Sequence, residues 1–215
     1  MMVPMLGWLA MLAIGGGLVM GFGIAPREVT QGSVQRIMYV HVPFAWVAYL
    51  AFAVVFVASI AYLWRRSAAA DRVAHASAEA GVVFTGLAIA TGSIWGKPTW
   101  GTWWTWDARL TSVALLFVLY LGYLMLRGMI EDRERGARYA AVLGIIAALD
   151  IPLVHFSVFW WRTLHQPPSI RPGSAAMPGV ILAALLVNVV AFTLLYAYFV
   201  AKRSRVLRLA EEMPA

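Results

Sequence analysis

Residues 43–63, PFAWVAYLAFAVVFVASIAYL, decide the fold of this chain, because the whole run carries no charged side chain. A helix rises about 1.5 Å per residue, so a run of this length crosses the ~30 Å hydrocarbon core of a bilayer. Five other apolar stretches approach the same length, at about residues 2–22, 80–95, 110–126, 139–157 and 178–200. The sequence therefore predicts an all-α integral membrane protein with about six transmembrane helices, forming a single membrane domain over residues 1–215.

The composition supports a membrane protein and narrows its chemistry. Hydrophobic residues make up 62% of the chain and charged residues 13%, whereas soluble domains are about 45–50% apolar and about 25% charged. The chain has no cysteine, which excludes disulfides, thiolate zinc sites and iron–sulfur clusters. The net charge of +7 does not indicate nucleic-acid binding, because no polar basic domain is present to carry it.

The charges between the spans predict the orientation of the helices. Eleven Lys and Arg residues lie after the second, fourth and sixth spans, and six lie after the first, third and fifth. Because cytoplasmic loops carry the excess of positive charge, we expect both termini in the cytoplasm and the other loops in the periplasm of a bacterial inner membrane. The first span lacks the positively charged start of a signal peptide, so we expect it to remain as a helix.

The loop over residues 95–109 is the most unusual segment. It contains five of the ten tryptophans, Trp95, Trp100, Trp103, Trp104 and Trp106. Two interpretations stay open: an aromatic belt at the membrane surface, or a shelf for a large, flat, apolar ligand. If the chain after Pro98 is helical, Trp100, Trp103, Trp104 and Asp107 share one face of that helix.

The four histidines are the candidate metal ligands. His41 and His165 both fall at the outer ends of predicted spans, so they can converge on one metal, and neutral imidazole is a common axial ligand of haem iron. The alternative is that each is an interfacial side chain with an ordinary hydrogen bond. His155 lies in or near the fifth span, where a functional and a packing role are equally compatible with the pattern, and His75 is expected in a solvated inner loop.

Four basic side chains on the outer side are candidates for pairing the two propionates of a haem. Arginine suits this task, since its guanidinium group binds carboxylates through two parallel hydrogen bonds. The candidates are Arg36 and Arg109, with Lys97 and Arg162 as further ones.

Three stretches of sequence resemble one known family. Residues 95–111, WGKPTWGTWWTWDARLT, resemble the tryptophan-rich WWD signature of haem-handling proteins. Within that group, YVHVP at 39–43 and SVFWWRTLHQ at 157–166 resemble the CcmC family of the cytochrome c maturation system, and the likeness covers about residues 22–166.

The resemblance implies a specific site and specific partners. It implies six spans with the signature loop in the periplasm, His41 and His165 as axial ligands of haem b, and a tryptophan loop with Asp107 that holds the porphyrin. It also places Arg36 and Arg109 in the haem site. The implied partners are the haem chaperone CcmE, the ABC-type subunits CcmA and CcmB, and the small subunit CcmD.

The function we expect is binding of haem at the periplasmic face and delivery to CcmE, with no catalytic residue in this chain, because haem and chaperone supply the chemistry of attachment. A haem exporter is one alternative, but the spans carry no line of polar residues, and Asn188 alone does not make a path. A membrane b-type cytochrome is another, although such proteins usually place paired histidines within the spans. A synthase subunit of the other haem-ligation system shares the tryptophan signature, but the shorter chain and the sequence around His165 favour CcmC.

Overall fold

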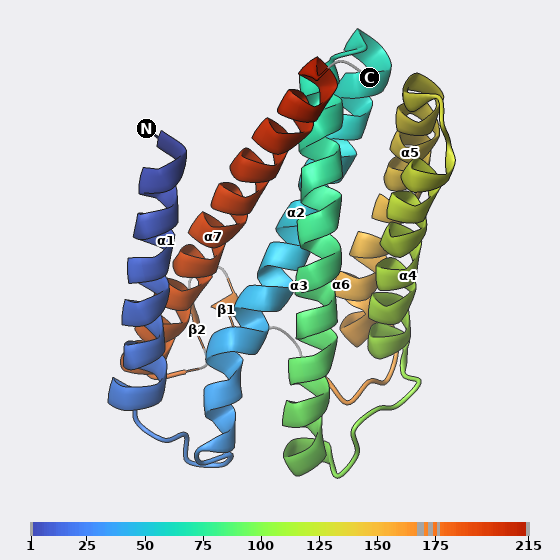
Figure 1. Cartoon of the computed structure of the whole chain (residues 1–215). Helices are drawn as coiled ribbons and strands as arrows, with labels where there is room; N and C mark the ends of the chain where they lie inside the picture. The colour runs from blue at the N-terminus through green and yellow to red at the C-terminus, as the bar shows by residue number, and fades with distance from the viewer. Residues whose placement is uncertain (1, 167–169, 172–173, 176, 214–215) are drawn as a thin grey trace.

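The computed structural model describes residues 2–166, 170–171, 174–175 and 177–213, and these are nearly all helical. Seven α-helices follow one another along the chain (Figure 1): α1 (Met2–Leu18), α2 (Met38–Arg65), α3 (Ala68–Trp100), α4 (Ala108–Met129), α5 (Arg133–Ala148), α6 (Asp150–Trp160) and α7 (Gly179–Glu212). A π-helical turn (Val19–Ile24) extends α1, and a 3-10 turn (Val34–Ile37) leads into α2. Before α7, β1 (Ile170–Arg171) and β2 (Ser174–Ala175) pair in antiparallel register.

Six helical segments are long and apolar enough to cross a membrane, which confirms the predicted fold class. The fifth of them, Arg133–Trp160, consists of two helices, because α5 ends before Leu149 and α6 begins at Asp150. Pro152 accounts for the break, since it has no N–H to donate to Ala148 four residues earlier. The single helix predicted at 139–157 is therefore interrupted near its middle.

Helices α2 and α3 form the centre of the bundle and pack closely along their length. A side chain at Gly81 would meet the Phe52 ring at 2.3 Å, so only glycine allows this approach of α3 to α2. Phe52 in turn stacks on Tyr120 of α4, with ring centroids 3.7 Å apart. On the other side, α1 packs on α7, where the Asn188 amide donates to the Gly17 carbonyl at 2.8 Å.

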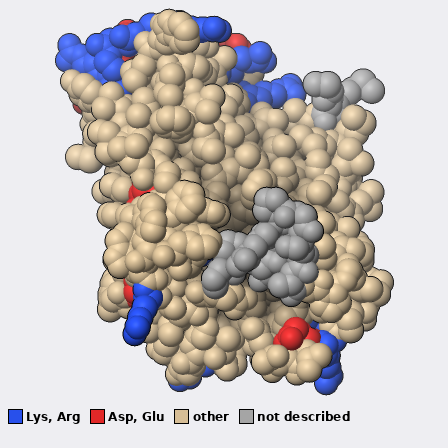
Figure 2. All heavy atoms as spheres, turned by 180° about the vertical axis from the view of Figure 1, so that it is seen from behind, with Lys and Arg blue, Asp and Glu red and all other residues tan. Residues whose placement is uncertain are grey.

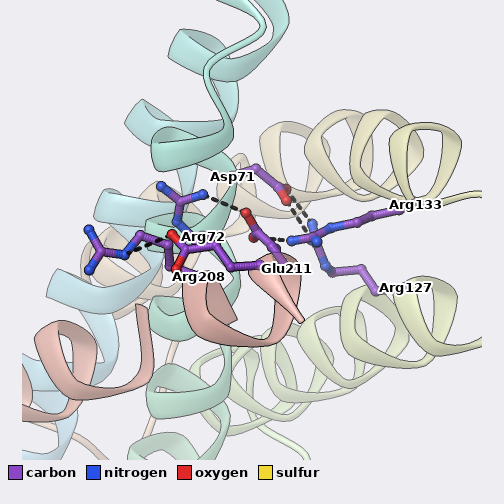
Figure 3. Close-up of polar contacts among 7 residues, drawn as sticks. Asp71, Arg72, Arg127, Arg133, Arg208 and Glu211 are labelled. Atoms are coloured by element: carbon purple, nitrogen blue, oxygen red, sulfur yellow. Dashed lines mark hydrogen bonds and ion pairs between the residues drawn. The ribbon is translucent and has the colours of Figure 1, made fainter. Parts of the chain in front are cut away.

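Charged side chains gather at one end of the bundle, the end at which the chain also terminates (Figures 1 and 2). There α3 and α7 continue well beyond the stretches predicted from hydropathy at 80–95 and 178–200. Ion pairs hold these extensions to their neighbours: Asp71 of α3 accepts two hydrogen bonds from Arg127 of α4, at 2.6 and 2.8 Å, and Glu79 accepts two from Arg203 of α7 (Figure 3 draws the first pair).

Candidate functional site

His41 lies in the second turn of α2, facing α3. Its Nδ1 is 3.1 Å from the Thr91 hydroxyl oxygen, and that hydroxyl donates its own hydrogen to the Leu87 carbonyl at 2.7 Å. The Thr91 oxygen can therefore only accept from His41, which places a ring hydrogen on Nδ1 and, in the neutral imidazole, leaves the lone pair on Nε2.

Two further residues of α3 fix the position of the His41 ring. A Cβ at Gly92 would meet His41 Cε1 at 2.9 Å, so a side chain there would displace the imidazole. Trp95 contacts the ring edge-to-face, with centroids 5.6 Å apart, and its indole N–H donates to Gln31 at 2.8 Å. Gly92 and Trp95 thus both restrict the position of the imidazole.

His165 reaches the same region from the segment after α6. Its ring lies edge-to-face on Trp100, the last residue of α3, with centroids 4.6 Å apart. Its backbone N–H donates to the Thr163 hydroxyl at 3.1 Å, and Nδ1 is buried without a hydrogen-bond partner among the described residues. Burial, followed by the positive charge of Arg109, lowers the pKa of His165 to about 4, so the imidazole is neutral at physiological pH.

Asp107 connects two parts of the site through its backbone partners. One carboxylate oxygen accepts from the Leu110 N–H at 2.9 Å and caps α4, while the other accepts from the Leu164 N–H at 3.2 Å. The start of α4, which carries Arg109, is thereby attached to the segment that carries His165.

A cavity that is partly open to the outside is lined by both histidines. The predicted site residues that line it are His41, His165, Trp100, Trp103 and Arg109. Side chains from α2, α3 and α4 complete a mostly apolar wall, among them Ala45, Ala48, Tyr49, Thr85, Ala88, Ile89, Leu110, Val113 and Leu116.

The other predicted site residues lie outside this lining. Trp95 is behind His41, and Trp104 contacts Trp106 edge-to-face at 5.5 Å, with 79% of Trp106 exposed. Asp107 accepts the two backbone hydrogen bonds described above. Arg36 donates to the Ala25 carbonyl at 3.3 Å and so connects the turn before α2 to the end of the first span.

The helical face of tryptophans required a helix from Pro98 to Asp107, and the structure does not contain that helix. Helix α3 continues through Pro98 but ends at Trp100, because Gly101 takes a left-handed conformation with φ of 79° and its N–H bonds to the Lys97 carbonyl. Residues after Gly101 are not helical up to Ala108, so Trp103 and Trp104 point to different surroundings. Glycine just beyond Trp100 was the sequence signal for this end.

Several cavity residues were not predicted, although a pattern in the sequence marks them. Ala45, Ala48 and Tyr49 follow His41 at positions that share its helix face, and Thr85, Ala88 and Gly92 follow the same spacing on α3. Small side chains at this spacing on two packed helices leave room between them. His155 is exposed on α6 and does not line the cavity.

Two imidazoles facing one cavity can hold a metal that brings its other ligands with it. In the described part of the chain, no group of three or more His, Cys, Asp or Glu residues is placed to hold a bare ion. A metal inside a flat macrocycle meets this requirement, because the macrocycle supplies the remaining ligands and an apolar wall suits its faces.

Comparison with known proteins identifies the family of this chain. All 215 residues match the family described as CcmC, heme exporter protein C. This chain belongs to that family. A relative called "Heme exporter protein C" from Bradyrhizobium diazoefficiens is 44% identical over 209 residues, covering 94% of this chain and 78% of the relative.

Two further relatives show the same likeness. The protein of the same name from Escherichia coli K12 is 43% identical over 165 residues, covering 76% of this chain and 67% of its own. A "Putative cytochrome c biosynthesis ccmC-like mitochondrial protein" from Arabidopsis thaliana is 35% identical over 203 residues, covering 94% of this chain and 76% of its own. With six apolar helices and bacterial relatives, this heme exporter protein C family member is a multi-pass protein of the inner membrane.

Proposed function

We propose that this chain binds haem b between His41 and His165 at the periplasmic face and delivers it to the haem chaperone CcmE. The family supports the broader part, a role in haem handling for cytochrome c maturation. The observation that carries the finer part is the pair of imidazoles on one mostly apolar cavity, His41 with Nδ1 turned to Thr91 and His165 with a buried Nδ1 that has no partner among the described residues.

Other residues of the site take roles that follow from their contacts. Trp100 and Trp103 contact the macrocycle as part of the cavity wall, and Arg109 pairs a propionate. Trp104 and Trp106 do not line the cavity, and Trp106, which is exposed and contacts the half-buried Trp104, suits contact with the incoming chaperone. When bound, haem supplies the reactive vinyl group, and this chain holds and orients it.

Membership of the family also supports a place among the Ccm proteins. Within that system, we propose the ABC-type subunits CcmA and CcmB and the small subunit CcmD as partners of this chain in the membrane. The test is to purify the tagged chain in mild detergent from cells that also express CcmA, CcmB and CcmD. If none of these three proteins is purified with the chain, the assignment is contradicted.

An absorption spectrum of the purified protein, oxidised and reduced, tests the haem site. We expect a b-type haem with two nitrogen ligands, a loss of haem in His41→Gly and in His165→Gly, and partial recovery when imidazole is added. His155→Gly is the matched control, because His155 is exposed on α6 away from the cavity, and it should leave the spectrum unchanged. An unchanged spectrum in the double variant of His41 and His165 would refute the proposed ligands.

A further inference from the structure

We propose that the groove between the start of α3 and the end of α7 binds the phosphate group of an anionic phospholipid. This groove lies at the charged end of the bundle, far along α3 from the cavity at Trp100. Three of its six lining residues are arginines and none is acidic: Ala69, Arg72 and Val73 from α3, and Ser204, Arg205 and Arg208 from α7.

The groove has a surplus of positive charge. Glu211 is shared by two guanidinium groups, those of Arg72 at 2.7 Å and of Arg133 (Figure 3). Arg208 reaches Glu212 only at 3.7 Å, with both side chains more than half exposed. Arg205 has no ion pair with any residue that the structure describes. Four guanidinium groups thus face two carboxylates, and the surplus of two positive charges exceeds the single negative charge of a phospholipid phosphodiester, which it can therefore balance.

The groove lies at the depth of lipid headgroups. Trp64, at the end of α2, is 80% exposed, and Arg65 lies over its ring with 5.6 Å between the guanidinium carbon and the ring centroid. Exposed Trp beside Arg is typical of the membrane–water interface. Only residues 66–67 separate α2 from α3, so Arg72 lies about one helical turn from this level and within reach of lipid phosphates.

The chemistry of the lining favours a lipid over a free phosphate. Guanidinium groups bind phosphate oxygens through paired, charge-assisted hydrogen bonds, and the buried Ser204 hydroxyl, which has no partner among the described residues, can donate another. Ala69 and Val73 give the groove a small apolar side, which suits the glycerol and the first carbons of an acyl chain. Basic pockets between helices at the cytoplasmic side of membranes recognise anionic lipids in this way.

The test measures lipid retention by native mass spectrometry of the full-length protein in detergent. Phosphatidylglycerol and phosphatidylcholine with the same acyl chains are compared on the wild type, on Arg205→Gln/Arg208→Gln, and on Arg135→Gln/Arg138→Gln. The last variant is the matched control, because it removes two exposed arginines from the same end of the molecule but not from the groove. A second variant, Arg205→Lys/Arg208→Lys, keeps the charge if the glutamine variant fails to fold.

We expect the wild type and the control to retain phosphatidylglycerol in preference to phosphatidylcholine. The glutamine variant should bind phosphatidylglycerol about 30-fold more weakly, from about tenfold per 1.4 kcal/mol and about 1 kcal/mol for each basic residue near an anionic membrane. The lysine variant should bind phosphatidylglycerol more weakly than the wild type but more tightly than the glutamine variant. Equal loss in the control would overturn the proposal in favour of bulk charge. Equal retention of both lipids, or displacement of the lipid by millimolar inorganic phosphate, would overturn it as well.

Discussion

Replacing Asp107 by Asn should loosen the segment that carries His165 without disturbing the start of α4. Asn still offers one oxygen, and since Asn is as good an N-cap as Asp, the bond from Leu110 should survive. The second carboxylate oxygen becomes an NH₂ group, which cannot accept the Leu164 N–H. A hydrogen bond to a charged group is worth about 1.5–3 kcal/mol. At 3.2 Å and exposed to solvent, this bond belongs at the low end, about 1.5 kcal/mol, or roughly tenfold in the opening equilibrium.

Hydrogen exchange of the Leu164 amide in the detergent-solubilised protein measures this opening directly. We expect exchange about tenfold faster in Asp107→Asn, with a lower haem content and a spectrum that loses the signature of two nitrogen ligands. Asp132→Asn is the control, because Asp132 caps α5 in the same way at the other end of the bundle. If haem content falls in Asp107→Asn while exchange at Leu164 is unchanged, Asp107 acts by touching haem, and the reasoning from its backbone contacts is refuted.

Three further predictions test the site and the topology. Thr91→Val keeps the shape of the side chain but removes the acceptor that fixes the α2 imidazole, so haem affinity measured by titration should fall about 10-fold or more, and an unchanged affinity would contradict the assigned ring orientation. Gly92→Ala should lower haem content sharply because its Cβ meets the imidazole, whereas Gly86→Ala, with only an ordinary contact at 3.5 Å, should not, and equal effects would point to general destabilisation. Cysteines introduced at the exposed positions Thr99 and Ala210 should react with impermeant reagents from opposite sides of the membrane, with position 99 labelled from the periplasm. Labelling of both positions from one side would overturn the predicted orientation.

Hydropathy predicted the six spans but not where the helices end, because it records only the part of a helix that lies in lipid. The first turns of α3, with Asp71 and Glu79, are polar yet helical, since arginines of α4 and α7 pair with both carboxylates. Those partners are distant in sequence, so no local pattern announces them. The span predicted at 43–63 also begins too late, because α2 begins at Met38 and continues through Pro43.

The sequence predicted which side chains lie near one another better than it predicted the backbone between them. His41, His165 and Arg109 meet at one cavity as expected, although the segment between Gly101 and Asp107 is not the helix that the tryptophan spacing suggested. Spacing predicts a shared face only if the backbone stays helical, and one glycine in the left-handed conformation decides that it does not. Asp150 escaped notice entirely, and both its carboxylate oxygens are buried without partners among the described residues.

The two histidines are held with unequal stiffness. His41 belongs to a helix of 28 residues, so moving its backbone requires melting a turn inside a packed bundle. His165 belongs to an irregular segment attached through the Leu164 amide and a local turn at Thr163. Widening the gap between the imidazoles therefore costs less free energy when His165 moves than when His41 moves. Under the proposed function, the cavity has a fixed wall at α2 and a yielding wall at His165: haem is anchored on the first and leaves past the second once the hydrogen bond between Leu164 and Asp107 opens.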